Sequence, residues 1–117
     1  MSEPGINLTV AVLIATRNRV DDVRAALESV YGQTRIPDEV VLLDDASDEP
    51  LAAALADFEH SSQITWIRSE SPSGVSGARN KLTEESTSDV LIYLDDDAVF
   101  LSDDAIDQTL GVLSSYP

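Results

Sequence analysis

The sequence predicts a doubly wound α/β fold, in which helices cover both faces of a mainly parallel sheet. Short apolar runs alternate with segments whose apolar residues recur at helical spacing. The runs contain almost no polar residues, which is typical of parallel strands buried on both faces. The connections are short, and no linker or internal repeat divides the chain, so we expect one domain over residues 1–117.

The first strand and the first helix are expected at residues 8–15 and 20–30. The segment 8–15 reads LTVAVLIA, an almost continuous apolar run rich in β-branched residues. An apolar stripe of helical spacing follows, formed by Val20, Val23, Leu27 and Val30. Asp21 and Asp22 lie in the first turn of this helix, where the helix dipole favours acids, and Gly32 helps to end it.

Further strands and helices are expected to alternate along the rest of the chain. The strands are expected at 40–43, 64–67 and 90–94. The helices are expected at 51–58, at about 75–85 and around the stripe of Ile106, Leu110 and Leu113. The last helix is expected to have Ser102 or Asp103 as its N-cap. This alternation indicates parallel strands joined by right-handed crossovers.

Polar residues follow the predicted strands at the points where these strands end. In an open parallel sheet, ligands bind beyond the carboxyl ends of the strands, so these residues are candidates for a binding site. The candidates are Thr16, Arg17, Asp44, Asp45, Asp95, Asp96 and Asp97, together with Arg79 in the helix that follows the loop 69–77.

The triplet of Asp95, Asp96 and Asp97 is the clearest of these candidates. Adjacent acids repel one another unless a cation or strong hydrogen-bond donors compensate. Hard divalent cations such as Mg²⁺ or Mn²⁺ prefer oxygen ligands and often bridge a carboxylate to substrate phosphates. If strand geometry continues, Asp95 and Asp97 project to one side and Asp96 to the other. An isolated triplet is more often a solvated turn or a helix N-cap, but its place after a buried strand favours a metal site.

Two interpretations stay open for the other charged candidates. Asp44 and Asp45 could hydrogen-bond the base or the ribose of a nucleotide, or one of them could cap the helix that follows. Arg79 could reach a diphosphate, or it could form a structural salt bridge with an acid. His60 is expected at an exposed helix end and is given no role.

The charge of the chain excludes one class of partner. The 7 lysine and arginine residues against 22 acids give a formal net charge of −15, a field that repels nucleic acid. The chain has no cysteine, which excludes disulfides and thiolate metal sites. Residues 1–7 lack the basic residues and the apolar run of a signal peptide, so we expect a cytoplasmic location.

Five segments carry a recognisable pattern in matching order and spacing. They are VAVLIATRNR (10–19), ALESVYGQT (26–34), DEVVLLDDAS (38–47), GVSGARN (74–80) and VLIYLDDDAVF (90–100). With them the chain resembles the family 2 glycosyltransferases, inverting enzymes of the GT-A fold that use nucleotide-diphosphate sugars. The resemblance covers nearly the whole chain and implies the Rossmann-like, nucleotide-binding half of a GT-A domain.

The resemblance implies a role for each matching residue in binding the nucleotide. Thr16 is similar to the residue that lies near the nucleotide base. Arg17, the next residue, is expected to bind the nucleotide as well. Asp45 is similar to the acid that reads the base, with Asp44 beside it. Arg79 is similar to the basic residue near the base or the phosphate.

The triplet takes its roles from the same resemblance. Asp96 is similar to the acid near the ribose, Asp97 to the metal ligand in contact with the diphosphate, and Asp95 opens the Asp-x-Asp motif as a second ligand. The implied cofactor is Mn²⁺ or Mg²⁺. The implied reaction is a single displacement, in which an acceptor hydroxyl attacks the anomeric carbon while the cation and Arg79 stabilise charge on the departing diphosphate.

The acceptor site and the catalytic base are expected outside this chain. Family members normally continue well beyond the triplet, and Asp103, Asp104 and Asp107 belong to the last predicted helix. We therefore expect a fragment that binds donor and metal but does not complete transfer alone. The acceptor, a saccharide, lipid or protein, and any attachment to the cytoplasmic face of a membrane would depend on other regions.

Other functions fit the residues less well. A phosphoacceptor receiver domain also binds Mg²⁺ through clustered acids, but it needs an acidic pair after the first strand, where this chain has Thr16 and Arg17. A non-catalytic nucleotide-binding module would keep the fold without the chemistry, and the intact triplet argues against it. Gly74 and Gly77 do not form the Gly-x-Gly-x-x-Gly turn of a dinucleotide-binding domain.

Overall fold

A computed structural model describes residues 8–115 and confirms the predicted α/β fold. The strands form one parallel sheet in the order β3-β2-β1-β4. The strands are β1 (Val10–Thr16), β2 (Glu39–Asp45), β3 (Ile64–Ser69) and β4 (Val90–Tyr93). Each predicted apolar run contributes a strand with slightly shifted ends. The N-terminal segment on which the expectation about a signal peptide rests lies outside the described residues.

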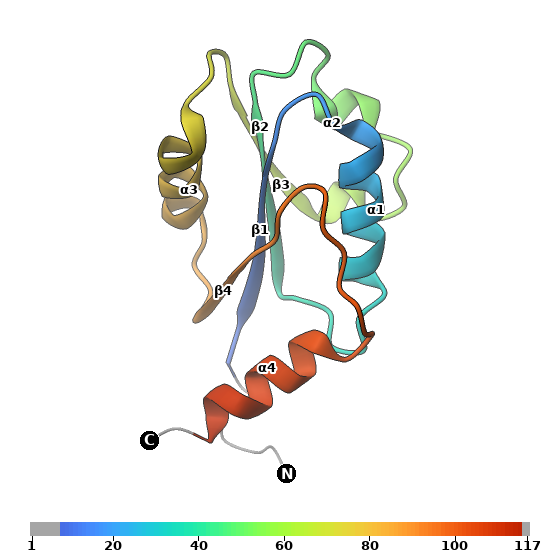
Figure 1. The fold of residues 1–117 in the computed structure, drawn as a ribbon, viewed down its shortest axis with the longest axis vertical. Helices are drawn as coiled ribbons and strands as arrows, with labels where there is room; N and C mark the ends of the chain where they lie inside the picture. Colours follow the sequence, from blue (N-terminus) through green and yellow to red (C-terminus); the bar gives the residue numbers. More distant parts are fainter. Residues whose placement is uncertain (1–7, 116–117) are drawn as a thin grey trace.

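The helices lie on both faces of the sheet and across one end of it (Figure 1). They are α1 (Val20–Tyr31), α2 (Leu51–Ala54), α3 (Gly74–Glu85) and α4 (Ala105–Ser114), with a short 3₁₀ helix η1 (Ser61–Gln63) between α2 and β3. α3 covers one face, α1 and α2 cover the other, and α4 lies across the end of the sheet where β1 begins. The end where the strands finish is left to loops.

The side chains of the two central strands pack alternately into two apolar layers. On the α1 side, Val12 and Leu42 belong to a buried cluster with helix residues such as Leu27. On the α3 side, Leu13 and Leu43 pack with Ala78 and Leu82 of α3. Since successive strand residues face opposite ways, the acids that end β2 also face opposite layers. This alternation decides which of them can reach a site beside α3.

An acid at the start of β2 holds the connection between α3 and β4 in place. Glu39, the first residue of β2, accepts hydrogen bonds through Oε1 from the Ser86 and Ser88 hydroxyls, at 2.6 and 2.7 Å, and from the backbone N–H of Thr87 at 2.9 Å. Partial burial acts to raise the pKa of Glu39, but these hydrogen bonds outweigh it and hold the pKa below its ordinary value. Glu39 therefore ties the α3–β4 connection to β2 as a carboxylate.

The N-cap expected for the last helix is wrong by a residue or two. α4 begins at Ala105 after Asp104, and neither Ser102 nor Asp103 caps it through a side chain. The backbone N–H of Ile106 instead donates to Oε1 of Gln33 at 3.1 Å, and Nε2 of Gln33 donates to the Ser102 carbonyl at 2.7 Å. Gln33 is buried at the end of α1, so a distant side chain performs the capping.

The second helix is shorter than the predicted 51–58. After Ala54 the chain tightens into turns, in which the N–H of Phe58 donates to the Leu55 carbonyl at 3.0 Å. The ring of Phe58 then packs against Tyr31 of α1, with 5.9 Å between the ring centroids.

In the described part of the chain, no helix has the length and apolar character needed to cross a membrane.

Candidate functional site

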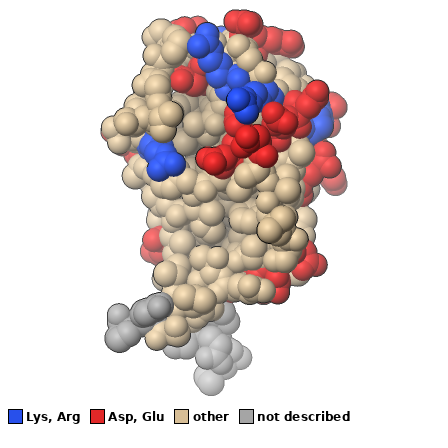
Figure 2. All heavy atoms as spheres, viewed as in Figure 1, with Lys and Arg blue, Asp and Glu red and all other residues tan. Residues whose placement is uncertain are grey.

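A hollow lies at the carboxyl edge of the sheet, between the ends of β1 and β4 and the helix α3. Its volume of about 560 Å³ falls in the range of small-molecule sites. All predicted site residues except Asp44 line it, namely Thr16, Arg17, Asp45, Arg79, Asp95, Asp96 and Asp97. Acidic and basic side chains lie side by side around it on the upper part of the molecule (Figure 2). The fold thus brings together residues that are far apart in the sequence.

The floor of the hollow is apolar and its rim is charged. Leu13 of β1 and Ala78 and Leu82 of α3 line the floor and belong to the buried layer beneath α3. Gly74, the first residue of α3, lies on the rim with φ at 73°, a left-handed conformation that glycine adopts without strain. No side chain caps the first turn of α3. Its free N–H groups and the helix dipole therefore favour an anion at this rim.

Asp45 lies on the α3 side of the sheet and lines the hollow. Its Oδ1 accepts hydrogen bonds from the backbone N–H and the hydroxyl of Ser73, both at 2.8 Å. These bonds fix the loop that leads into α3. They use one carboxylate oxygen, so Oδ2 is left for a ligand in the hollow.

Asp44 is the one predicted site residue that the fold places elsewhere. It faces the α1 side, is 3% exposed, and accepts hydrogen bonds from the backbone N–H of Ser47 at 3.0 Å and of Leu51 at 2.9 Å. Arg68 Nη1 donates to the same carboxylate at 2.7 Å. Burial acts to raise the pKa of Asp44, but these hydrogen bonds hold it below its ordinary value. Because Leu51 begins α2, Asp44 has the capping role, and its expected contact with a nucleotide is not supported.

The acid triplet forms a turn and does not continue the strand. The last ladder bond of β4 runs from the Leu94 N–H to the Leu13 carbonyl, and the Ala98 N–H then donates to the Asp95 carbonyl, both at 3.0 Å. The expectation that Asp95 and Asp97 share one side of an extended segment therefore fails, because this hydrogen bond closes the backbone. All three carboxylates nevertheless line the hollow.

Asp96 is the best fixed of the three acids. The Thr16 hydroxyl, at the end of β1, donates to Asp96 Oδ2 at 2.8 Å. Thr16 is buried, and the Asp96 side chain is 17% exposed against 61% for Asp97. Asp97 is therefore the acid of this pair that is open to a ligand.

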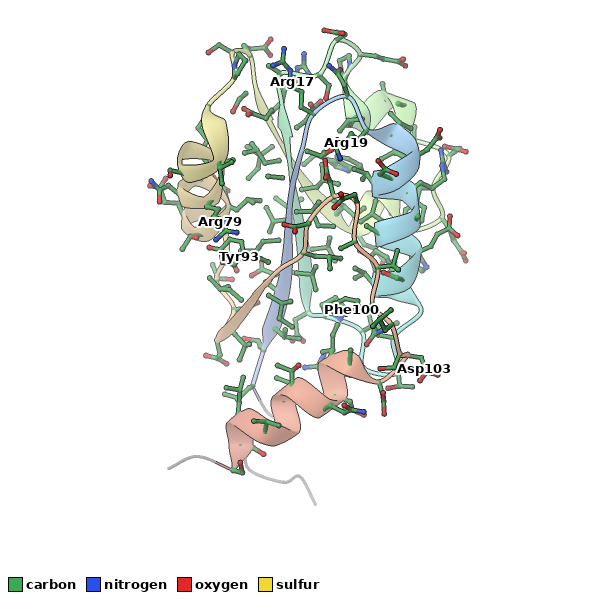
Figure 3. The ribbon with its side chains drawn as sticks, viewed as in Figure 1. Arg17, Arg19, Arg79, Tyr93, Phe100 and Asp103 are labelled. Carbon is green, nitrogen blue, oxygen red and sulfur yellow. The ribbon has the colours of Figure 1, made fainter. Side chains whose placement is uncertain are left out.

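Arg19 completes the site, although it is not among the residues predicted from the sequence. Its Nη1 lies 3.8 Å from Asp96 Oδ1 and 3.7 Å from Asp97 Oδ2, and the side chain points from the loop after β1 toward the turn after β4 (Figure 3). Its position in the sequence is consistent with this place, since Arg19 follows Thr16 and Arg17 after the first apolar run. Charge alone did not tell which arginine would face the triplet.

Arg79 lies on the opposite wall, beside an aromatic ring that sequence reasoning also missed. Its guanidinium carbon is 5.1 Å from the centroid of the Tyr93 ring, which is a cation–π contact (Figure 3). The Tyr93 hydroxyl hydrogen-bonds the Thr83 hydroxyl of α3. Within residues 8–115, Arg79 makes no salt bridge, so the structural alternative for this residue is not observed. Tyr93 holds the guanidinium at the mouth of the hollow.

The acids fit a cation that is shared with a ligand better than one held by the protein alone. Among the described residues, no three acidic or histidine side chains converge closely enough to form a complete metal site. Asp97 and Asp95 are exposed carboxylates on the hollow, and Mg²⁺-like cations commonly take one or two carboxylates and complete their shell with phosphate oxygens and water. The arrangement can therefore hold a cation that arrives with a phosphorylated ligand.

Comparison with known proteins identifies the chain with one enzyme family. The model of glycosyl transferase family 2 matches residues 11–115. An uncharacterized glycosyltransferase of Haemophilus influenzae is 32% identical over 108 residues, which cover 92% of this chain and 35% of that protein. The chain spans about a third of the length of the curated relatives it matches.

Solved structures share the fold at low sequence identity. A mannosyltransferase from Pyrobaculum calidifontis, in complex with GDP-Man and Mn²⁺, superposes with a TM-score of 0.79 at 22% identity and covers 100% of this chain and 35% of its own. S. aureus TarS in complex with UDP superposes with a TM-score of 0.78 at 19% identity, covering 91% of this chain and 32% of its own. At these identities the likeness shows the shared fold.

Proposed function

This chain belongs to glycosyl transferase family 2, and from that premise we propose that its hollow binds the nucleoside diphosphate of a sugar donor. The observation that carries the proposal is the meeting of Thr16, Asp45, Arg79 and the acid triplet around one hollow. A sugar nucleotide needs an apolar floor, hydrogen-bonding groups and positive charge for its phosphates, and this hollow offers each of them. Two structural neighbours hold UDP and GDP-Man, which supports this class of ligand.

The nucleobase of the donor is assigned to the part of the hollow between β1 and α3. There Asp45 has a free carboxylate oxygen, and the floor of Leu13 and Leu82 is apolar. The diphosphate is assigned to the rim, where Arg79 and the N-terminus of α3 supply positive charge. Asp96, held by Thr16, is assigned to the ribose.

The metal ligands in this proposal are Asp97 and, second to it, Asp95. Both carboxylates are exposed on the hollow, and the cation would be Mn²⁺ or Mg²⁺. The neighbour from Pyrobaculum calidifontis binds Mn²⁺ together with GDP-Man, which supports a cation shared with the donor. When bound, the cation would neutralise charge on the diphosphate oxygens.

The proposed reaction is an inverting single displacement. The oxygen of an acceptor hydroxyl forms a bond to the anomeric carbon, the bond from that carbon to the diphosphate oxygen breaks, and a base takes the hydroxyl proton. In this chain Arg79 would hold the diphosphate as it takes up the bonding electron pair. The catalytic base and the acceptor site are assigned to the part of the family that this chain does not span, and donor and cation binding are assigned to this chain.

Two alternative functions, a receiver domain and a non-catalytic nucleotide-binding module, can be distinguished from this assignment. Family membership overturns the phosphoacceptor receiver domain, which also needs a basic residue after a fifth strand, and the described residues form a sheet of four strands. A non-catalytic nucleotide-binding module differs only in the chemistry of the complete protein. It would bind the nucleotide in this hollow without supporting transfer.

A thermal-shift screen tests the proposed ligand class. The chain is heated with UDP, GDP, ADP and CDP, each with and without Mn²⁺. We expect one or two of these nucleotides to raise the melting temperature with Mn²⁺ and to lose most of the effect without it, because binding to the folded state stabilises it. Equal, small shifts for all nucleotides and for inorganic phosphate would reject the proposal.

A further inference from the structure

Arg19 lies between two carboxylates of the triplet, and we propose that it is an exchangeable counter-ion that competes with a divalent cation for Asp97. Its Nη1 is nearly equidistant from Asp96 and Asp97, at 3.8 and 3.7 Å. Among residues 8–115, it is the basic side chain that forms ion pairs with the triplet. The inference rests on the proposed function, because it concerns how the donor site takes up its cation.

The ion pairs of Arg19 are loose enough to exchange. Both distances are longer than a hydrogen bond, and the side chain is 52% exposed. Ion pairs of this kind contribute little free energy, since water screens them and a long side chain loses conformational freedom in making them. A divalent cation in direct contact with a carboxylate can therefore displace the guanidinium.

The acids and the backbone stay in place while the side chain moves. Asp96 is anchored by Thr16, and the Arg19 carbonyl accepts the first hydrogen bond of α1, from the Val23 N–H at 2.9 Å. On the other side, the Asn18 N–H donates to the Ser47 hydroxyl at 2.9 Å. With the backbone of Arg19 fixed on both sides, rotation of its side chain is the available movement.

A second hollow provides another binding position for the displaced guanidinium. Arg19 lines this hollow as well, and the triplet does not. The acids of the second hollow are Asp21, Asp22, Asp48 and Glu49, all exposed. Because a positive side chain is attracted to clustered acids, Arg19 can leave the triplet without losing all of its ionic contacts. The two hollows give Arg19 two alternative positions.

A titration with Mn²⁺ alone tests this role without any nucleotide. We compare the wild type with Arg19→Gln. Arg24→Gln is the matched control, because Arg24 of α1 pairs with Asp57 and lines neither hollow. We expect Arg19→Gln to bind Mn²⁺ about five- to tenfold more tightly than the wild type, from the loss of two exposed ion pairs. Arg24→Gln should bind Mn²⁺ like the wild type.

A double-mutant cycle tests the second position. Asp48→Asn combined with Glu49→Gln should weaken Mn²⁺ binding in the wild type and should weaken it less in the Arg19→Gln background, where no guanidinium needs a destination. Mn²⁺ affinity of Arg19→Gln that equals or falls below the wild-type affinity overturns the proposal, and so does an equal effect in both backgrounds. Failure of the chain to bind any nucleotide would reject the proposed function and would leave the Mn²⁺ titration valid.

Discussion

The hydroxyl of Thr16 lies 2.8 Å from the carboxylate of Asp96, although the two residues are 80 positions apart in the sequence. The bond joins the end of β1 to the turn after β4. Since Thr16 is buried and Asp96 is largely covered, the contact fixes one acid of the triplet before any ligand arrives. The other groups of the hollow are arranged around this fixed point.

Replacing Thr16 with valine should damage the site more than the fold. Valine keeps the shape but removes the donor, so Asp96 loses a charge-assisted hydrogen bond worth about 1.5 kcal/mol. We expect nucleotide affinity in the presence of Mn²⁺ to fall roughly tenfold, measured by calorimetry. Thr65→Val, at an exposed position of β3, is the control and should bind like the wild type. Unchanged affinity in Thr16→Val would mean that Asp96 needs no anchor.

Replacing Asp44 with asparagine should damage the fold more than the site. The buried carboxylate accepts hydrogen bonds from Ser47, Leu51 and Arg68. Its neutral replacement offers an NH₂ group in place of one acceptor oxygen and leaves the partly exposed Arg68 guanidinium without its counter-charge. We expect the free energy of unfolding in urea to fall by about 3 kcal/mol. Asp48→Asn is the exposed control. Weaker nucleotide binding in Asp44→Asn at full stability would return this acid to the binding residues.

The stability of the chain should fall in acid because several carboxylates have lowered pKa values. The pKa values are held below the ordinary 3.8 of aspartate in Asp38 and Asp44, and below the ordinary 4.5 of glutamate in Glu39. Their contribution is fully present above these values and is lost as the pH falls through the lower pKa of the folded state. Urea unfolding between about pH 7 and pH 3 should therefore show declining stability below about pH 4.5. Glu39→Gln should flatten part of this decline, and a pH profile identical to the wild type would contradict the role of Glu39.

Tyr93 should act as a positioning residue for Arg79. Tyr93→Phe keeps the ring under the guanidinium and loses only the hydrogen bond to Thr83, so its nucleotide affinity should stay within about twofold of the wild type. Tyr93→Ala removes the ring and should lower the affinity about fivefold. Calorimetry on the three proteins makes the comparison. Equal affinities in Tyr93→Phe and Tyr93→Ala would show that the ring does not place Arg79.

The strands and helices could be predicted because their signals are local. The apolar run 8–15 and the stripe of α1 carry the periodicity that decides each element. The α4 N-cap could not be predicted, because Gln33 supplies the contact from a distant part of the chain. The turn at Asp95 was missed for a different reason: one hydrogen bond from Ala98 replaces the extended backbone that a strand would continue.

The candidate site was predicted better as a set of residues than as a geometry. The apolar residues of β2 are buried on both faces, so no polar alternation shows whether Asp44 or Asp45 faces α3. Only the packing of Leu43 beneath α3 fixes the register and assigns Asp45 to the hollow. Arg19 has a long, flexible side chain, and the choice between Arg17 and Arg19 as partner of the triplet depends on how the loop after β1 turns.

Calorimetric titration of UDP and GDP into the wild type and Asp97→Ala, each with and without Mn²⁺, tests directly whether Asp97 binds the cation that holds the donor. We predict that the wild type binds at least one nucleotide in an Mn²⁺-dependent way, and that Asp97→Ala loses at least about tenfold in this affinity. Asp107→Ala, at an exposed position of α4, should bind like the wild type. Unchanged Mn²⁺-dependent affinity in Asp97→Ala would contradict the account.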